Sequence, residues 1–168
     1  MKRAWIAASA ALLLAAPAAY AGVGQGDIEA GISISLNSTE VETDGAPAQK
    51  FDSGLVSVSG GYFYTDMIQF KVALNMNVTS DDTSGSLNPG ADFLFTQAGS
   101  DMVPFAGASY GLAIGDTTDT DFLEFHGGLK YFFRERTSVE FKLARFEPMD
   151  SDFDFGHTDL TVGLNVYF

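Results

Sequence analysis

The chain has 168 residues, no cysteine and a formal net charge of −13. This length suits one domain, and the lack of cysteine excludes disulfides as a source of stability. The acidic balance argues against nucleic-acid binding, which needs a basic surface, and no apolar run is long enough for a transmembrane helix.

Residues 1–21 have the pattern of a secretory signal peptide. Lys2 and Arg3 precede an apolar run over residues 4–16, and an Ala-Tyr-Ala sequence then supplies the small residues that signal peptidase requires. We therefore predict cleavage after this segment rather than membrane anchoring. The mature domain would comprise residues 22–168 with a net charge of −15, because both basic residues of the leader are lost.

The mature chain contains eight segments in which apolar and polar residues alternate with a period of two. This period predicts β-strands with one apolar face, not helices. The strands are expected near residues 26–38, 51–64, 67–80, 90–97, 103–115, 122–133, 138–146 and 159–168. Tight connections are expected at 65–66, 98–101 and 134–137, and longer or strongly polar ones near 38–50, 79–89, 116–121 and 147–155. This pattern is typical of an up-and-down meander whose two rims face different surroundings.

Two folds fit such a meander, and they differ in the direction of the apolar face. A soluble lipocalin-like barrel points that face inward, whereas an outer-membrane barrel points it outward into lipid. Small residues dominate the polar face and the charges gather at strand ends, which favours the membrane barrel. The aromatic residues at strand ends also favour it as two interfacial girdles: Tyr62, Phe63, Tyr64, Tyr131, Phe132, Phe133, Phe146, Phe153, Phe155, Tyr167 and Phe168.

Three segments carry a family resemblance. "GGYFYTDMIQFKVAL" at 60–74, "VPFAGASYGLAI" at 103–114 and the ending "TVGLNVYF" resemble the small outer-membrane β-barrel proteins of Gram-negative bacteria, the OmpA/OmpX-type group. The resemblance implies an all-β, eight-stranded antiparallel up-and-down transmembrane β-barrel in the outer membrane, with periplasmic termini and extracellular acidic loops. It also implies a C-terminal assembly signal that the barrel-insertion machinery reads, formed by Thr161, Gly163, Val166 and Phe168.

The predicted inner face carries nine ionisable residues: Glu29, Lys71, Asp92, Glu124, His126, Lys130, Glu140, Lys142 and Asp159. Isolated buried charges are costly, so we expect these residues to pair. They could form either a structural polar core or an ion-pair plug that opens a pore. The structural core is favoured, because eight strands enclose little more than their own side chains.

Enzymatic and metal-binding functions were also considered. The two histidines, His126 and His157, have no adjacent serine, and no catalytic residue is predicted. The segment from Asp150 starts like an EF-hand loop, but Phe155 and Thr161 replace its glycine and its bidentate glutamate. Two interpretations of the acidic loops stay open: a weaker Ca²⁺ or Mg²⁺ site, or an acidic rim that is only solvated. The site would be formed by Asp116, Asp119, Asp121, Asp150, Asp152 and Asp154.

These patterns predict an outer-membrane barrel with a structural or surface-interaction role, in envelope integrity or loop-mediated contacts. The alternative is a narrow channel for ions or small solutes. A lipid-A-modifying enzyme and a soluble lipocalin-like binder are less favoured. No cofactor is predicted, and the expected partners are outer-membrane lipid, lipopolysaccharide and, during biogenesis, the insertion machinery. We expect a monomer that binds no nucleic acid.

Overall fold

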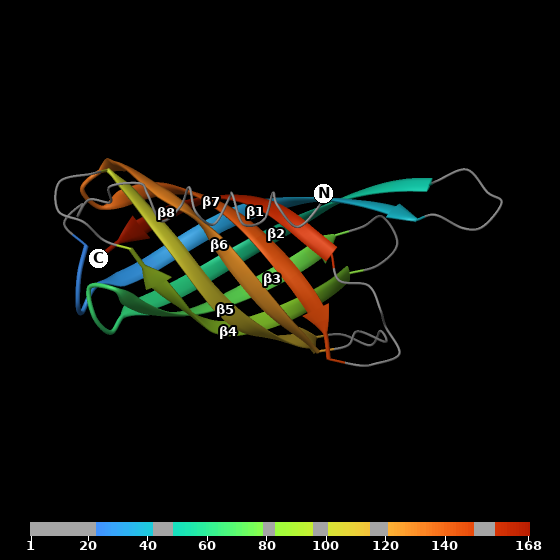
Figure 1. Ribbon diagram of the computed structural model, residues 1–168, viewed down its shortest axis with the longest axis horizontal. Helices are drawn as coiled ribbons and strands as arrows, with labels where there is room; N and C mark the ends of the chain where they lie inside the picture. The colour runs from blue at the N-terminus through green and yellow to red at the C-terminus, as the bar shows by residue number, and fades with distance from the viewer. Residues whose placement is uncertain (1–22, 42–48, 79–82, 96–100, 115–120, 150–156) are drawn as a thin grey trace, which may run out of the picture.

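The described part of the chain folds into a closed barrel of eight antiparallel strands arranged in sequence order (Figure 1). The computed structural model describes residues 23–41, 49–78, 83–95, 101–114, 121–149 and 157–168. Its strands are β1 (Ile28–Val41), β2 (Gln49–Phe63), β3 (Ile68–Val78), β4 (Thr83–Leu94), β5 (Met102–Ile114), β6 (Phe122–Arg134), β7 (Thr137–Pro148) and β8 (His157–Tyr167). The predicted strand number and fold class are confirmed. In these ranges, no helix has the length and apolar character needed to cross a membrane.

The barrel closes where the first strand meets the last. Ile32 of β1 pairs with Val58 of β2 on one side and with Leu164 of β8 on the other. The backbone amide of Phe168 donates to the carbonyl of Ile28 at 2.9 Å, and the Ile28 amide donates back at 3.1 Å. Closure gives the backbone groups of both terminal strands their hydrogen-bond partners, which a structure in hydrocarbon requires.

The apolar face of the sheet points outward. Ile34, Phe125 and Leu143 are 57%, 53% and 54% exposed, respectively, whereas Ser35 and Glu124 on the alternate positions are buried inside the barrel. A lipocalin-like fold would have the opposite orientation. The outward apolar face therefore excludes that alternative and fits a wall in contact with lipid.

The strand bounds differ from the prediction in the first half of the chain. Residues 83–89, predicted as part of a polar connection, belong to β4. Small polar residues and Pro89 hide the alternation there. Pro89 has no amide hydrogen, and the pairing of β4 with β5 accordingly skips from Leu87 to Gly90 without a change of register. β1 and β2 are also longer than predicted and extend beyond the other strands at the end away from the C terminus (Figure 1).

Several predicted girdle aromatics lie inside the barrel instead. Phe63, Phe132 and Tyr167 are 1%, 4% and 1% exposed, and they form one buried apolar cluster with Val23, Leu94, Val103 and Phe105. At the opposite end, the ring of Phe146 packs edge-on against Phe122 at a centroid distance of 5.3 Å. The girdle prediction was wrong for these residues.

The reason for the error is the period of two. Within a run of three aromatic residues, only the first and third can share the outward side, so the middle one points into the barrel. Tyr62 and Tyr64 are exposed around Phe63, and Tyr131 and Phe133 are exposed around Phe132, as the girdle model requires. Phe153 and Phe155 lie outside the described residues.

Candidate functional site

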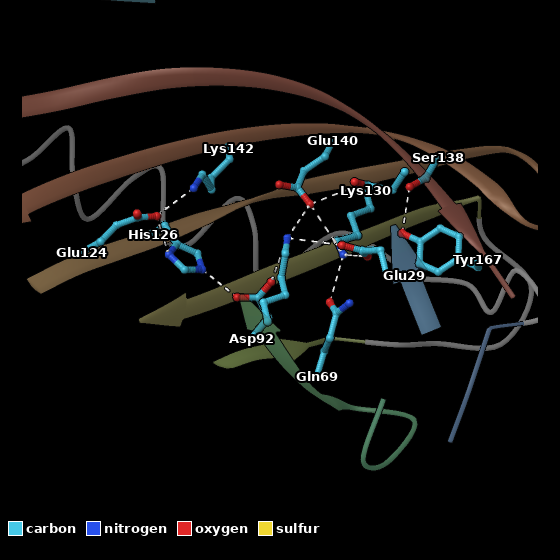
Figure 2. Close-up of polar contacts among 12 residues, drawn as sticks. Glu29, Gln69, Asp92, Glu124, His126, Lys130, Ser138, Glu140, Lys142 and Tyr167 are labelled. Carbon is cyan, nitrogen blue, oxygen red and sulfur yellow. Dashed lines mark hydrogen bonds and ion pairs between the residues drawn. The ribbon is translucent and has the colours of Figure 1, made fainter. Parts of the chain in front are cut away.

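The lumen holds a buried ion pair with a hydrogen-bond partner, near the end of the barrel that has the short turns (Figure 2). The Nζ atom of Lys130, on β6, contacts the carboxylate of Glu29, on β1. It also donates a hydrogen bond to Oε1 of Gln69 at 3.1 Å and lies 3.5 Å from a carboxylate oxygen of Glu140. A lysine with no exposed side-chain surface needs such compensation, because burying an isolated ammonium group is prohibitively costly.

Lys71 links the Glu29–Lys130 pair to the other charged residues of the lumen. Its Nζ atom lies 3.3 Å from Glu140, 3.4 Å from Glu29 and 3.5 Å from Asp92. These carboxylates belong to β7, β1 and β4, while Lys71 belongs to β3. One side chain therefore joins strands on different sides of the barrel wall.

His126 joins two carboxylates farther along the lumen. Its Nε2 atom is 2.7 Å from Oδ1 of Asp92, and its Nδ1 atom is 2.9 Å from Oε1 of Glu124. Glu124 in turn accepts a hydrogen bond from Lys142 at 2.7 Å. The eight ionisable residues therefore form one continuous lumen network across β1, β3, β4, β6 and β7.

Neutral side chains complete the lumen network. The amide nitrogen of Asn165 donates to Glu140 at 3.3 Å, and that of Asn88 donates to Glu124 at 3.5 Å. Sequence reasoning missed these two residues and Gln69, because only charged residues were selected. Their positions on the polar parity of the strands were the available signal.

The buried apolar cluster closes the lumen next to Lys130. The Nζ atom of Lys130 lies 5.6 Å from the ring centroid of Phe105 and 5.9 Å from that of Tyr167, within cation–π range. The hydroxyl groups of Tyr167 and Ser138 share a hydrogen bond of 2.9 Å. The C terminus and the short turns lie at this end of the barrel (Figure 1).

A small polar cavity lies on the other side of the lumen network. Its volume is about 40 Å³, room for roughly three water molecules. Its lining combines charged residues of the network with Ala73, Asn75, Asn88, Gly90 and Ser109. Within the described residues, Oδ1 of Asn88 and Oγ of Ser109 have no hydrogen-bond partner, so both atoms remain able to bind water or another polar group.

The structure brings together eight of the nine predicted lumen residues. The ninth, Asp159, is buried nearer the opposite end, where one carboxylate oxygen lies 3.4 Å from the Ser35 hydroxyl. The side chain of His157 is outside the described part of the structure. Of the C-terminal residues, Thr161 and Gly163 face the lumen, whereas Val166 and Phe168 are exposed on the outer surface.

Of the six aspartates in the metal hypothesis, Asp121 lies in the described part of the chain. Asp121 accepts hydrogen bonds from the Tyr110 hydroxyl at 2.7 Å and from the Ala113 amide at 3.3 Å. The other five aspartates of the hypothesis, at 116, 119, 150, 152 and 154, lie outside the described residues. Among residues that are described, no three acidic, histidine or cysteine side chains gather as a metal site.

Taken together, the outward apolar face, the closed eight-stranded sheet and the polar lumen define the fold of the small outer-membrane β-barrels. Comparison with solved structures gives the same fold. The chain superposes on the N-terminal β-barrel domain of Pseudomonas aeruginosa OprF with a TM-score of 0.66 and 16% identity, covering 87% of this chain and 100% of that domain.

Two further barrels superpose over nearly their whole length. Neisserial surface protein A gives a TM-score of 0.62 at 14% identity, covering 87% of this chain and 99% of its own. Ail, the attachment invasion locus protein of Yersinia pestis, gives 0.58 at 10% identity, covering 86% and 99%. No protein-family model matches the sequence, and no curated protein matches it.

Proposed function

We propose that this protein is a structural and surface-interaction barrel of the outer membrane, with its acidic loops as the contact surface. The observation that carries the proposal is the double closure of the lumen. The lumen network ties strands together across the interior, and the buried apolar cluster lies beside it at the end with the short turns. A barrel of eight strands has no room for a further pathway around such side chains.

Planar-bilayer recordings of the refolded protein test this role against the channel alternative. The wild-type barrel should give no steady conductance. The double variant Phe132→Ala and Tyr167→Ala should give at most brief currents, because it removes two large rings from the buried apolar cluster but leaves the lumen network in place. The matched control is Tyr62→Ala with Phe133→Ala, which removes two outward rings and should stay silent. Reproducible single-channel steps from the wild type would overturn the structural role and support the channel.

The lumen geometry also supports a non-enzymatic role. Both ring nitrogens of His126 face carboxylates, so neither one faces the hydroxyl of Ser109, which lines the same cavity. A nucleophilic serine requires a base within hydrogen-bond reach. Incubation of the refolded barrel with lipopolysaccharide should leave lipid A unchanged in mass, and a mass loss matching an acyl chain would contradict this proposal.

The loops are proposed to meet anionic lipopolysaccharide through divalent cations, with the barrel acting as a monomer. Acidic loops and anionic headgroups repel one another unless Ca²⁺ or Mg²⁺ bridges them. Titration calorimetry with Ca²⁺ should show heat for the wild type and much less for Asp150→Asn, Asp152→Asn, Asp154→Asn. The absence of heat from the wild type would remove the cation from the proposal.

A further inference from the structure

The ring of His126 lies between two carboxylates inside the barrel. Its two nitrogens lie 2.7 Å and 2.9 Å from carboxylate oxygens of Asp92 and Glu124 (Figure 2). A neutral ring has one N–H donor and one lone pair, whereas the imidazolium ring has two donors. With a neutral ring, one nitrogen lone pair would face a carboxylate oxygen. The Nε2 atom is hydrogen-bonded to Asp92, whereas Nδ1 is close to Glu124 without the alignment of a hydrogen bond. Two carboxylates this close to one ring favour its charged form.

The charge balance of the lumen network gives the same result independently. The network contains four carboxylates and three lysines: Glu29, Asp92, Glu124 and Glu140 with Lys71, Lys130 and Lys142. A proton on His126 makes the fourth positive charge and brings the network to neutrality. Buried charges are tolerated when they are paired in this way.

Charged side chains and one aromatic ring surround His126, and Phe105 of β5 lies 6.1 Å from it between ring centroids. The charged groups that face it come from β3, β4, β6 and β7: Lys71, Asp92, Glu124 and Lys142. On the neighbouring strand β5, the residue paired with His126 is Gly107, which has no side chain. Within the described residues, the cationic side chains in direct contact with Asp92 and Glu124 are Lys71, Lys142 and, when protonated, His126.

We propose that His126 is a proton-binding site of the lumen, and that its proton joins the Lys71–Asp92 part of the lumen network to the Glu124–Lys142 part. The small polar cavity lies beside the ring, on the side away from the buried apolar cluster, and we infer that the proton exchanges through it. Loss of the proton leaves one carboxylate uncompensated and loosens the two parts. The lumen thereby responds to the pH of the external medium, a property beyond the structural role.

The protonation state can be measured directly on the wild-type barrel. We would label histidine with ¹⁵N, refold the protein in nanodiscs and record ring-nitrogen chemical shifts, assigning the two histidines with a His157→Gln variant. At about pH 7, where a solvated histidine is largely neutral, His126 should show two protonated nitrogens. A neutral ring at this pH would overturn the proposal, whatever the behaviour of any variant.

A rescue experiment tests the role of the charge. His126→Gln should lower the urea midpoint of unfolding, and adding Asp92→Asn should recover at least half of that loss. The second substitution restores equal numbers of positive and negative groups, and Lys71 keeps Glu29 and Glu140 as partners. Since the folded ring keeps a proton that the unfolded chain releases, the wild-type midpoint should also fall as pH rises from about 6 to 9. The His126→Gln variant should lose most of this dependence.

Ser57→Ala serves as a control in the same lumen, because Ser57 is buried on the inner face outside the lumen network. It should retain the wild-type pH dependence. If His126→Gln kept that dependence too, or if Asp92→Asn deepened the loss instead of reversing it, His126 would be a neutral packing residue and the proposal would fail. The silent-barrel role could still hold in that case, since bilayer conductance tests it separately.

Discussion

The Nζ atom of Lys130 contacts the carboxylate of Glu29 inside the barrel, and neither side chain has any exposed surface. The two residues lie on β6 and β1, which are not neighbours in the sheet. The pair therefore crosses the lumen, and its energetics differ from those of a surface ion pair. A surface pair contributes little, whereas removing one member of a buried pair leaves the other charge uncompensated.

This relationship predicts an asymmetric response to substitution. Lys130→Met should destabilise the barrel by about 3 kcal/mol, near the lower end of the range for breaking a buried pair, because Lys71 still faces Glu29 at 3.4 Å. Adding Glu29→Gln to Lys130→Met should recover part of this loss. The stability of the single and the double variant is measured by urea unfolding in lipid. The folded fraction is monitored by the difference in electrophoretic mobility between heated and unheated samples. If the double variant were less stable toward urea than Lys130→Met alone, the unpaired-charge explanation would be contradicted.

A second prediction concerns the space beside His126. A Cβ atom at Gly107 would collide with Oδ1 of Asp92, Nε2 of His126 and the backbone carbonyl of Ala91, which cannot move aside cheaply. Gly107→Ala should therefore destabilise the barrel by about 1–3 kcal/mol, the usual cost of overpacking. It should also weaken the contact between Asp92 and His126.

Gly127→Ala is the matched control for this substitution. Gly127 adjoins His126 in the chain but points the other way, and its nearest neighbour would be the Phe105 carbonyl at an ordinary 3.5 Å. The same unfolding assay should show little change for it. Equal losses for the two variants would mean that the lumen adapts to an added methyl group and that Gly107 is not required there.

The sequence predicted the strands of the barrel wall better than the side-chain contacts in the lumen. Alternation defined β3 and β8 because their outward residues are large and apolar, and it identified the outward face from the small inward residues. It failed for the first half of β4, where Pro89 and small polar residues leave no contrast between the faces. The inward position of Phe63 was predictable from its parity with Ser57, had parity been weighed above aromatic clustering.

The partners within the lumen could not be predicted. Lys71 reaches Glu140 on β7 at 3.3 Å, and this contact joins residues 69 positions apart on strands that are not neighbours. Such contacts depend on the stagger of the closed barrel and on the reach of long side chains, neither of which the period of two encodes. The sequence identified the ionisable residues of the inner face, but not the contacts that place His126 between Asp92 and Glu124.

A third prediction tests which face of the wall meets lipid. Leu74 is exposed on the outer surface near the middle of β3, where it pairs with Val58 and Leu87. Leu74→Arg should cost about 2–4 kcal/mol of stability in a bilayer, as expected for a cation near the midplane. Met67→Arg, in the exposed turn before β3, should cost at most about 1 kcal/mol. Equal stability of the two variants would mean that Leu74 does not face hydrocarbon.

The last prediction concerns Phe168, whose ring is exposed on the outer surface while its backbone closes the barrel. Phe168→Ala retains both backbone hydrogen bonds with Ile28 and removes only the ring. If the C-terminal segment is an assembly signal, this substitution should reduce the amount of folded barrel in the outer membrane of expressing cells. The purified Phe168→Ala variant, refolded in vitro, should keep nearly the wild-type urea midpoint, because the Phe168 ring is exposed and not packed in the barrel interior.

Phe133→Ala is the control, since it removes another exposed outward ring at the same end of the barrel but outside the C-terminal strand. It should leave the yield of folded barrel in cells close to that of the wild type. Equal yields for Phe168→Ala and Phe133→Ala would count against recognition of the terminal residue. A loss of the in vitro urea midpoint for Phe168→Ala would instead assign the ring a stabilising role, because the reduced yield would then follow from a weaker barrel rather than from failed recognition.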